Sequence, residues 1–184
     1  TKVTGVDIDP TDIVDAWKLK ATVFGAEYAR SAVVRSINVG LGDATGSETI
    51  IAGETVTAAG FTTCAHCGVV ATRPTETDRT RHRGFCATRR RTAERWERLL
   101  LSHELRTQAV RLLLPVSLLH FETTMTSFKG ALLLGLRRDF GGDPQHLDVV
   151  ASSMSDGTGA VRRFLVLHDT VPGGTGYLDR FGTP

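Results

Sequence analysis

The sequence predicts an α+β fold: a small antiparallel sheet that carries a cysteine-rich knuckle and packs with two or three amphipathic helices. Three observations predict it. Several short segments alternate apolar and polar residues as half-buried strands do, other segments repeat apolar residues at helical spacing, and all three cysteines of the 184-residue chain fall within residues 64–86. The hydrophobic content of 41% is that of an ordinary globular domain. We expect one domain over residues 1–184, with a small subdomain at about residues 60–90.

The first third of the chain is predicted to be mainly sheet. Strands are expected at residues 3–8, 32–39, 48–51 and 54–58, which alternate or are rich in β-branched residues. Residues 12–31 are the exception, because Trp17, Val23, Phe24 and Tyr28 have an amphipathic spacing that favours a helix. The sheet would then deliver the first two cysteines at the end of a strand.

The remainder of the chain is predicted to alternate helices and strands. Thr92 is a suitable N-cap for a helix that would end at Pro115, and it is followed by apolar residues at helical spacing: Trp96, Leu99, Leu100, His103, Val110 and Leu113. A second helix is expected over residues 126–139, ending at a glycine pair. Strands are expected at residues 116–121, 147–150 and 163–168, and residues 169–178 should form a turn that opens a short final helix.

The cysteines form a pattern typical of zinc sites. Cys64 and Cys67 stand in a C-x2-C pair, and His82 and Cys86 extend it to C-x2-C-x14-H-x3-C. A C-x2-C turn lets two thiolates bind one ion, and a second pair completes the tetrahedron that zinc prefers. Gly68 suits the sharp turn of such a knuckle. The sequence therefore predicts a zinc ion held by Cys64, Cys67, His82 and Cys86.

Other interpretations of these residues remain open. A C-x2-C pair can be a redox centre, but a third nearby cysteine would then be unexplained, and a secreted disulfide framework would require an even number of cysteines. The fourth ligand has several candidates. His82 has the right offset from Cys86, whereas His66 would point away from the shared ion, and His103 and His120 could reach it only through tertiary folding.

The predicted zinc is expected to be structural. Four protein ligands leave no position for the water molecule that catalytic zinc keeps. The chain also contains neither the H-x-E and P-C-x-x-C signature of zinc deaminases nor the H-E-x-x-H motif of metalloproteases.

Arginine is concentrated around the cysteines. Residues 73–98 contain nine arginines against four acidic residues, in a chain with a formal net charge of only +2. Guanidinium groups bind phosphate and stack on bases, so a nucleic-acid surface is expected here. It is assigned to Arg79, Arg81, Arg83, Arg89, Arg90 and Arg91. Two plainer explanations are that thiolates attract nearby cations and that arginine richness reflects genome composition.

Motifs of catalysis are missing from the sequence. There is no G-x4-G-K-[ST] loop, no D-E-x-[DH] box and no G-x-S-x-G elbow. The pairs His103–Glu104 and His168–Asp169 could serve catalysis, but a core or capping role is the more common one for such neighbours. The glycines of residues 173–176 could admit a phosphate or, more simply, allow a tight turn.

The location of the protein is predicted from what the sequence lacks. No apolar run reaches the length of a membrane span, and the first residues contain no signal-peptide segment. Reduced cysteines and no export signal predict a cytoplasmic protein. Because the sequence begins at Thr1 without methionine, we expect it to be a segment of a larger protein.

Three stretches together resemble a known family: the cysteine pattern, the sequence Leu-Leu-Leu-Ser-His-Glu-Leu-Arg at residues 99–106, and the tail Leu-Val-Leu-His-Asp-Thr-Val-Pro-Gly-Gly-Thr-Gly-Tyr-Leu at residues 165–178. The chain resembles the C-terminal zinc-binding domain of mitomycin-repair-type superfamily 2 DNA helicases, which also occurs in helicase-associated proteins of the DISARM phage-defence system. The resemblance spans about residues 52–178. It implies Cys64, Cys67 and Cys86 as zinc ligands, and this chain offers His82 where the family has a fourth cysteine.

The resemblance implies a non-catalytic accessory domain of an ATP-dependent DNA helicase in repair or phage defence. The ATPase lobes would be present in cis or in a helicase subunit in trans, and the arginines would guide a single DNA strand. The alternative is a zinc-stabilised module that docks a protein of a defence complex and does not contact nucleic acid. A third interpretation, an enzyme that uses His168 and Asp169, would require both side chains to converge on a pocket.

Overall fold

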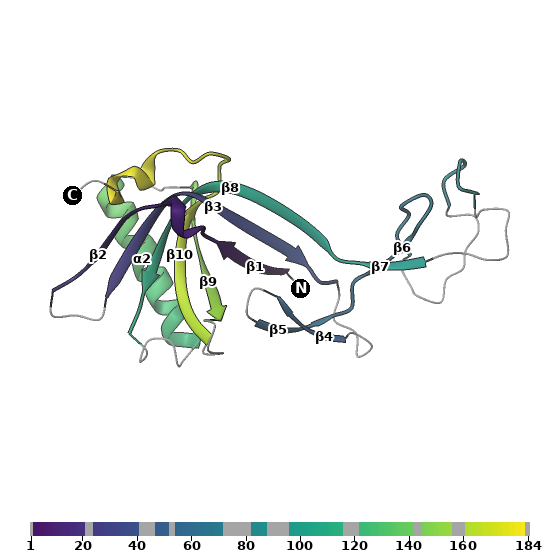
Figure 1. Ribbon diagram of the computed structural model, residues 1–184, viewed down its shortest axis with the longest axis horizontal. Coiled ribbons are helices and arrows are strands. Elements are labelled where there is room, and N and C mark those ends of the chain that lie inside the picture. Colours follow the sequence, from purple (N-terminus) through teal and green to yellow (C-terminus); the bar gives the residue numbers. More distant parts are fainter. Residues whose placement is uncertain are drawn as a thin grey trace. The chain divides into compact units, whose positions relative to one another are not determined.

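The computed structural model describes nine stretches of the chain, which form two compact units (Figure 1). The described residues are 2–20, 24–40, 47–51, 54–71, 82–87, 96–115, 122–141, 145–155 and 161–182. The first unit comprises Thr1–Val3, Ile37–Ile50 and Thr55–His103, and the second comprises Thr4–Ser36, Ile51–Glu54 and Glu104–Pro184. Within the described stretches, no helix is both long and apolar enough to span a bilayer.

A six-stranded sheet forms most of the second unit. Its strands follow the order β1-β3-β8-β10-β9, and β2 pairs with β3 off this path. The strands are β1 (Lys2–Asp7), β2 (Ile13–Lys18), β3 (Gly25–Asn38), β8 (Leu101–Leu113), β9 (Leu147–Ser155) and β10 (Val161–Asp169). The pairs β2–β3, β8–β10 and β9–β10 are antiparallel. The sequence expectation of an antiparallel sheet is therefore confirmed.

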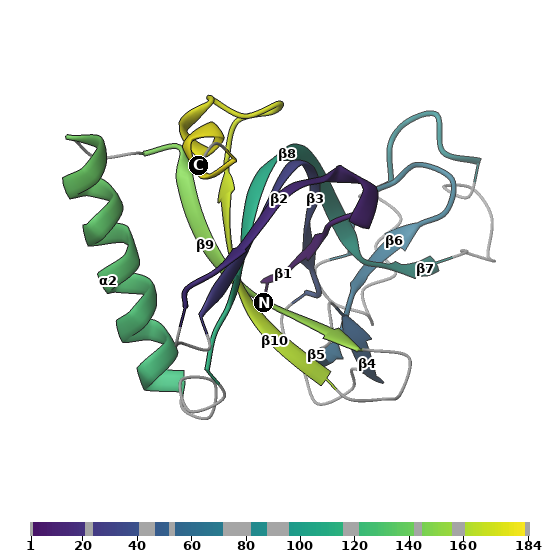
Figure 2. The same cartoon turned by 60° about the vertical axis from the view of Figure 1, so that its left-hand side comes forward.

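The helix α2 (Glu122–Phe140) covers one face of this sheet, as Figure 2 shows. Leu136 is buried, and Phe128, Leu132 and Phe140 pack against the same core, so the stripe predicted from the sequence faces the sheet. The sheet contributes Val110, Val149, Leu165, Leu167 and further apolar residues to this core. Each fully buried side chain of this kind contributes roughly 1.5–3 kcal/mol to the free energy of folding.

Strand β10 lies between β8 and the edge strand β9 and is buried on both faces. Residues 164–169 are all buried. Leu165 and Leu167 face α2, whereas Val166 joins Ala32 and Ala109 in a second cluster on the opposite face. Burial on both faces explains why this segment reads as a continuous apolar run rather than as an alternating strand.

Two segments that the sequence predicted to be helices are strands. Residues 12–31 form β2 and the first part of β3, and residues 96–113 form β7 (Trp96–Leu99) and β8. In β8 the residues at positions 107–110 are all buried, because strands cover it on both edges and the sheet is packed on both faces. Leu99, Leu100 and Leu113, the leucines of the predicted helical stripe, are exposed. The spacing of apolar residues that lie on two faces of a sheet therefore resembled the spacing on one face of a helix.

The helix count is correspondingly lower than expected. Among the described residues α2 is the one α-helix, against the two or three predicted. The final helix is a short 3-10 turn, η4 (Tyr177–Phe181), and a second such turn, η1 (Pro10–Asp12), precedes β2. Six predicted strands are confirmed, either within one residue at their ends or as parts of longer strands: 3–8, 32–39, 48–51, 54–58, 147–150 and 163–168. Two of them, β4 (Ser47–Ile51) and β5 (Glu54–Ala58), pair in a separate small sheet. The strand expected at residues 116–121 lies outside the described residues.

The end of the chain is tied to the sheet by Asp179. One carboxylate oxygen of Asp179 accepts hydrogen bonds from the Tyr28 hydroxyl at 2.6 Å and from Nε2 of Gln108 at 2.7 Å. Gly182 lies so close to Tyr28 that a Cβ atom at this position would stand 2.4 Å from the aromatic ring. Any larger residue at position 182 would push the tail away from the sheet.

The stability of this contact should depend on pH. Burial and the hydrogen bond to Asp179 raise the pKa of Tyr28 from its ordinary value near 10 to about 12. Since the folded-state pKa is the higher one, the stabilisation is complete below about pH 10 and is lost as the pH rises toward 12. We expect urea unfolding between pH 9 and 12 to show a steeper loss of stability for the native chain than for Tyr28→Phe. Parallel curves for the two proteins would contradict this assignment.

Candidate metal centre

A short hairpin of the first unit positions the first two cysteines. Strand β6 (Phe61–Cys64) pairs antiparallel with β7, and its last residue, Cys64, lies opposite Trp96. The chain then turns back: the Gly68 amide donates to the Cys64 carbonyl and the Cys64 amide donates to the Val69 carbonyl, both at 2.9 Å. Gly68 has a φ of 69°, in the left-handed region that favours glycine. The knuckle therefore begins at a strand end, as the sequence predicted.

Four side chains converge beyond this turn. One ligand atom from each of Cys64, Cys67, His82 and Cys86 lies within 4.8 Å of the others, and this Cys/His group could hold a metal ion. The sulfurs of Cys64 and Cys86 are 3.8 Å apart. Nδ1 of His82 lies 3.4 Å from the Cys67 sulfur and 3.5 Å from the Cys86 sulfur. All three cysteines are free thiols rather than disulfides.

The Cys/His group is shielded from solvent. Cys64, His82 and Cys86 are buried and Cys67 is partly exposed. Burial raises the pKa of the Cys67 thiol, so the apo group disfavours a thiolate there, and a bound cation would reverse this preference. The His82 ring lies against Trp96, with 5.2 Å between the ring centroids. Trp96 was missed by the sequence reasoning, since a residue assigned to a helix could not be placed opposite Cys64.

Some of the other predicted site residues lie outside the Cys/His group, and the rest are outside the part of the chain that the structure describes. His66 is exposed within the turn and His103 is exposed on β8, so neither is in the Cys/His group. Arg83 is exposed, next to His82 in sequence. The remaining residues of the predicted nucleic-acid surface, Arg79, Arg81, Arg89, Arg90 and Arg91, lie outside the described residues, as does His120.

His168 and Asp169 are buried at the end of β10 and do not line the cavity that the structure shows on the six-stranded sheet. One carboxylate oxygen of Asp169 accepts a hydrogen bond from the Val171 amide at 2.8 Å. The other accepts from the Thr175 amide at 2.6 Å and from the Thr175 hydroxyl. Both oxygens of Asp169 are thus used to hold the loop that follows, which is a structural role.

The glycines of residues 173–176 allow the same loop to pack closely against β8. The Gly173 amide donates to the Arg106 carbonyl, which joins the loop to β8. Gly174 has a φ of 81°, and a Cβ atom there would lie 2.6 Å from Oε1 of Gln108. Close packing against β8 therefore explains this glycine without a bound phosphate.

Comparison with known proteins gives one similar solved structure. No protein-family model and no curated protein match the chain. The chain is similar to the crystal structure of the DUF1998 helicase MrfA bound to DNA, with a TM-score of 0.45 and 12% sequence identity. The similarity covers 98% of this chain but 18% of the helicase, so the chain spans less than a fifth of that protein.

Proposed function

We propose that this chain is a zinc-stabilised accessory domain of an ATP-dependent DNA helicase that acts in repair or phage defence. It supports the motor, contacts single-stranded DNA and performs no catalysis of its own. The observation that carries the proposal is the buried Cys/His group. The resemblance of the cysteine pattern and of the tail at residues 165–178 supports the assignment to a helicase.

Three distances within the Cys/His group fit zinc. A tetrahedral zinc ion with Zn–S bonds of about 2.3 Å and a Zn–N bond of about 2.0 Å separates two sulfurs by about 3.8 Å, and sulfur from nitrogen by about 3.5 Å. The separations found are 3.8 Å for the Cys64–Cys86 sulfur pair and 3.4 and 3.5 Å from Nδ1 of His82 to two sulfurs. Three thiolates and an imidazole also favour zinc over magnesium or calcium, which prefer oxygen ligands.

The ligand set supports a structural role for this zinc. Four protein donors fill a tetrahedron and leave no open position for a substrate or an activated water molecule. The sequence contains no phosphate loop, so the ATPase lobes would lie elsewhere, either in cis or in a helicase subunit in trans. The role left to the domain is to brace the motor and to guide a strand of DNA.

If the arginines contact DNA, the affinity for DNA should depend on salt by a predictable amount. We expect fluorescence anisotropy with a labelled single strand to show binding that weakens as salt rises from low to physiological concentration, since phosphate contacts release counterions. Reversing the charge of Arg89, Arg90 and Arg91 should reduce the slope of log affinity against log salt by about 2, because each contact to a single strand contributes about 0.7.

A matched triple variant controls for net charge. Arg106, Arg138 and Arg163 are exposed and lie outside residues 73–98, so reversing them changes the total charge equally. This control should bind almost as the native chain does. Equal losses in both triple variants, or no loss in either, would count against a specific arginine surface. Single-stranded and duplex DNA would be titrated in parallel to compare the two substrates.

A docking module that does not contact nucleic acid is the second candidate, and one observation favours it. Apolar side chains of the first unit are exposed: Phe85, next to Cys86 in sequence, is 76% exposed, and Leu99, Leu100 and Leu101 are 42–53% exposed. An apolar surface of this kind binds protein partners with little dependence on salt. Absence of DNA binding even at low salt would make this the better function.

A further inference from the structure

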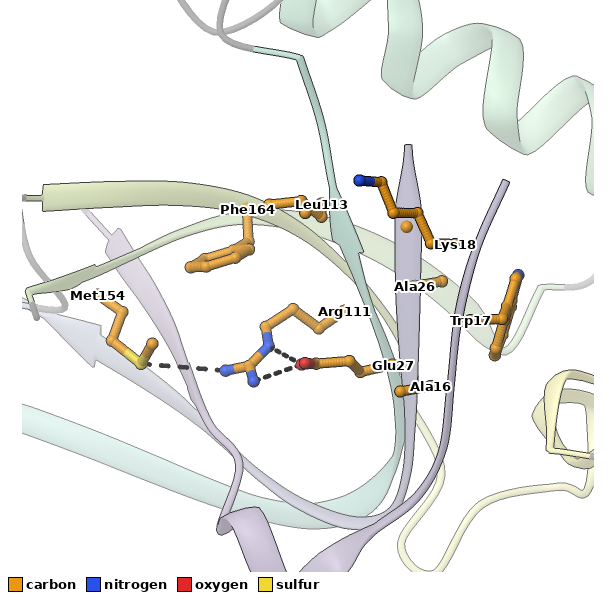
Figure 3. A pocket seen from close by; sticks show the side chains of 10 residues that line it. Ala16, Trp17, Lys18, Ala26, Glu27, Arg111, Leu113, Met154 and Phe164 are labelled. Carbon is orange, nitrogen blue, oxygen red and sulfur yellow. Dashed lines mark hydrogen bonds and ion pairs between the residues drawn. The ribbon is translucent and has the colours of Figure 1, made fainter. Parts of the chain in front are cut away.

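The second unit contains a cavity of about 570 Å³ on the main sheet (Figure 3). Arg111 and Glu27 alternate along their strands with Val110, Leu112, Ala26 and Tyr28, which pack in the core beneath α2. The cavity therefore opens on the sheet face opposite the helix. Its walls are made by Lys18, Glu27, Arg111, Leu113, Met154 and Phe164.

The cavity exists because its floor is nearly free of side chains. Gly25 lies on the floor, and the Ala16 methyl lies beside Glu27 across the β2–β3 pair. A Cβ atom at Gly25 would stand 3.2 Å from the Trp17 carbonyl oxygen and 3.8 Å from the Leu113 Cβ. The small residues leave a flat backbone surface at the bottom, with polar and apolar side chains around it.

Arg111 is held rigidly in the wall of this cavity. Its Nε and Nη2 donate to one oxygen of Glu27 at 2.7 and 2.5 Å, and its guanidinium lies 5.2 Å from the centroid of the Phe164 ring. Its side chain is only 16% exposed. The remaining nitrogen, Nη1, faces the Met154 sulfur at 3.9 Å, which is a weak acceptor. Nη1 is thus a donor without a strong partner in the described part of the chain.

The charges around the cavity leave an excess of positive charge. Glu27 is paired with Arg111, so these two charges offset each other. Lys18 is exposed at the rim and has no ion pair among the residues that the structure describes. A ligand that complements the cavity therefore needs an apolar body, a hydrogen-bond acceptor for Arg111 and a negative group near Lys18.

We propose that this cavity binds an unstacked nucleobase of single-stranded DNA. The base would lie among Leu113, Met154 and Phe164, a ring carbonyl or nitrogen would accept from Nη1 of Arg111, and the adjoining phosphate would meet Lys18. Aromatic and arginine side chains on an open sheet face hold single strands in this way, because every base has an apolar face and polar edges. The inference deepens the proposed function by naming a contact to the base in addition to the phosphates.

A buried peptide side chain fits the cavity less well. An aliphatic residue would cover Nη1 of Arg111 without giving it an acceptor, and an unpartnered buried donor is costly. A basic residue would repel Lys18. A nucleotide provides the acceptor and the negative charge in one ligand.

The test compares three ligands on the full chain. The ligands are a labelled oligothymidylate, a strand of the same length with abasic sites, and thymidine monophosphate. We expect the oligothymidylate to bind about tenfold or more tightly than the abasic strand, which is the range expected for a base stacked on protein side chains. Thymidine monophosphate should bind weakly, because it lacks the neighbouring phosphates of a strand.

Two pairs of matched variants localise the contact. Ala16→Trp fills the cavity from the exposed edge strand, and Val14→Trp places the same side chain elsewhere on that strand. Lys18→Glu reverses the rim charge, and Lys20→Glu gives the same net charge two residues away. Ala16→Trp should abolish the preference for oligothymidylate over the abasic strand, and Lys18→Glu should weaken binding about tenfold. The two control variants should bind as the native chain does.

The outcomes separate this inference from the proposed function. If both strands bind equally, or if Ala16→Trp keeps the preference, the base pocket is refuted. In that case a loss of binding on reversal of Arg89, Arg90 and Arg91 would leave the proposed function standing. Binding of thymidine monophosphate as tight as that of the strand would overturn the strand as ligand. No binding of any ligand would refute both and favour the protein-docking module.

Discussion

Removal of the metal from the Cys/His group is expected to unfold the segment around it and to leave the second unit folded. A structural zinc ion contributes roughly 10–16 kcal/mol to the folding of small zinc domains, which equals or exceeds the whole stability of an average domain. The hairpin of β6 and β7 has few buried apolar residues to replace that contribution. A strong chelator should therefore abolish the thermal transition of the first unit.

Trp96 offers a direct measurement of this unfolding. Its ring lies against His82 of the Cys/His group, whereas the second tryptophan, Trp17, lies in the other unit. In a Trp17→Phe background, Trp96 fluorescence should shift to longer wavelength on chelation and return when zinc is restored. Metal content is measured in parallel, and one zinc ion per chain is expected. An unmoved thermal transition after complete metal loss would refute the structural role.

Single substitutions identify the ligands. Cys86→Ser should lose the metal and unfold the segment as chelation does, whereas His66→Ala should keep both, because His66 is exposed and outside the group. His82→Cys should keep the metal, since a fourth thiolate suits zinc. If His82→Ala binds zinc as tightly as the native chain, another residue is the fourth ligand.

Asp169→Ala is expected to cause the second largest loss, about 3–5 kcal/mol in the free energy of unfolding. Asp169 is fully buried, and its carboxylate accepts hydrogen bonds from the amides of Val171 and Thr175 and from the Thr175 hydroxyl. Alanine would leave these three donors without their acceptor beside a fully buried position. The loss is measured by urea unfolding of the second unit.

Two further variants distinguish anchoring from catalysis or binding. Thr175→Val removes one of the three bonds and should cost about 1 kcal/mol, while Asp169→Asn keeps an acceptor and should fall between Thr175→Val and Asp169→Ala. All three should bind DNA normally at temperatures where they are folded. An Asp169→Ala variant of native stability would contradict the anchoring role, and one that lost DNA binding as well would point to a functional site.

The sequence by itself determined the parts of this protein that depend on local spacing. The Cys/His group could be predicted because a C-x2-C turn and an H-x3-C segment bring their donors together through short stretches of backbone. The stripe of Phe128, Leu132 and Leu136 could be predicted because one face of α2 packs on the sheet and the other face meets solvent. In both cases the pattern in the chain repeats the geometry of a single element.

Only the tertiary structure decided what residues 12–31 and 96–113 become. Both contain apolar residues at spacings that suit a helix, but β3 and β8 lie inside a sheet that is packed on both faces, where the period of two is lost. The cavity was likewise invisible in the sequence, because Glu27 and Arg111 are 84 residues apart and meet only when their strands share a sheet. Non-local strand pairing set these features, and no local pattern encodes the partner of a strand.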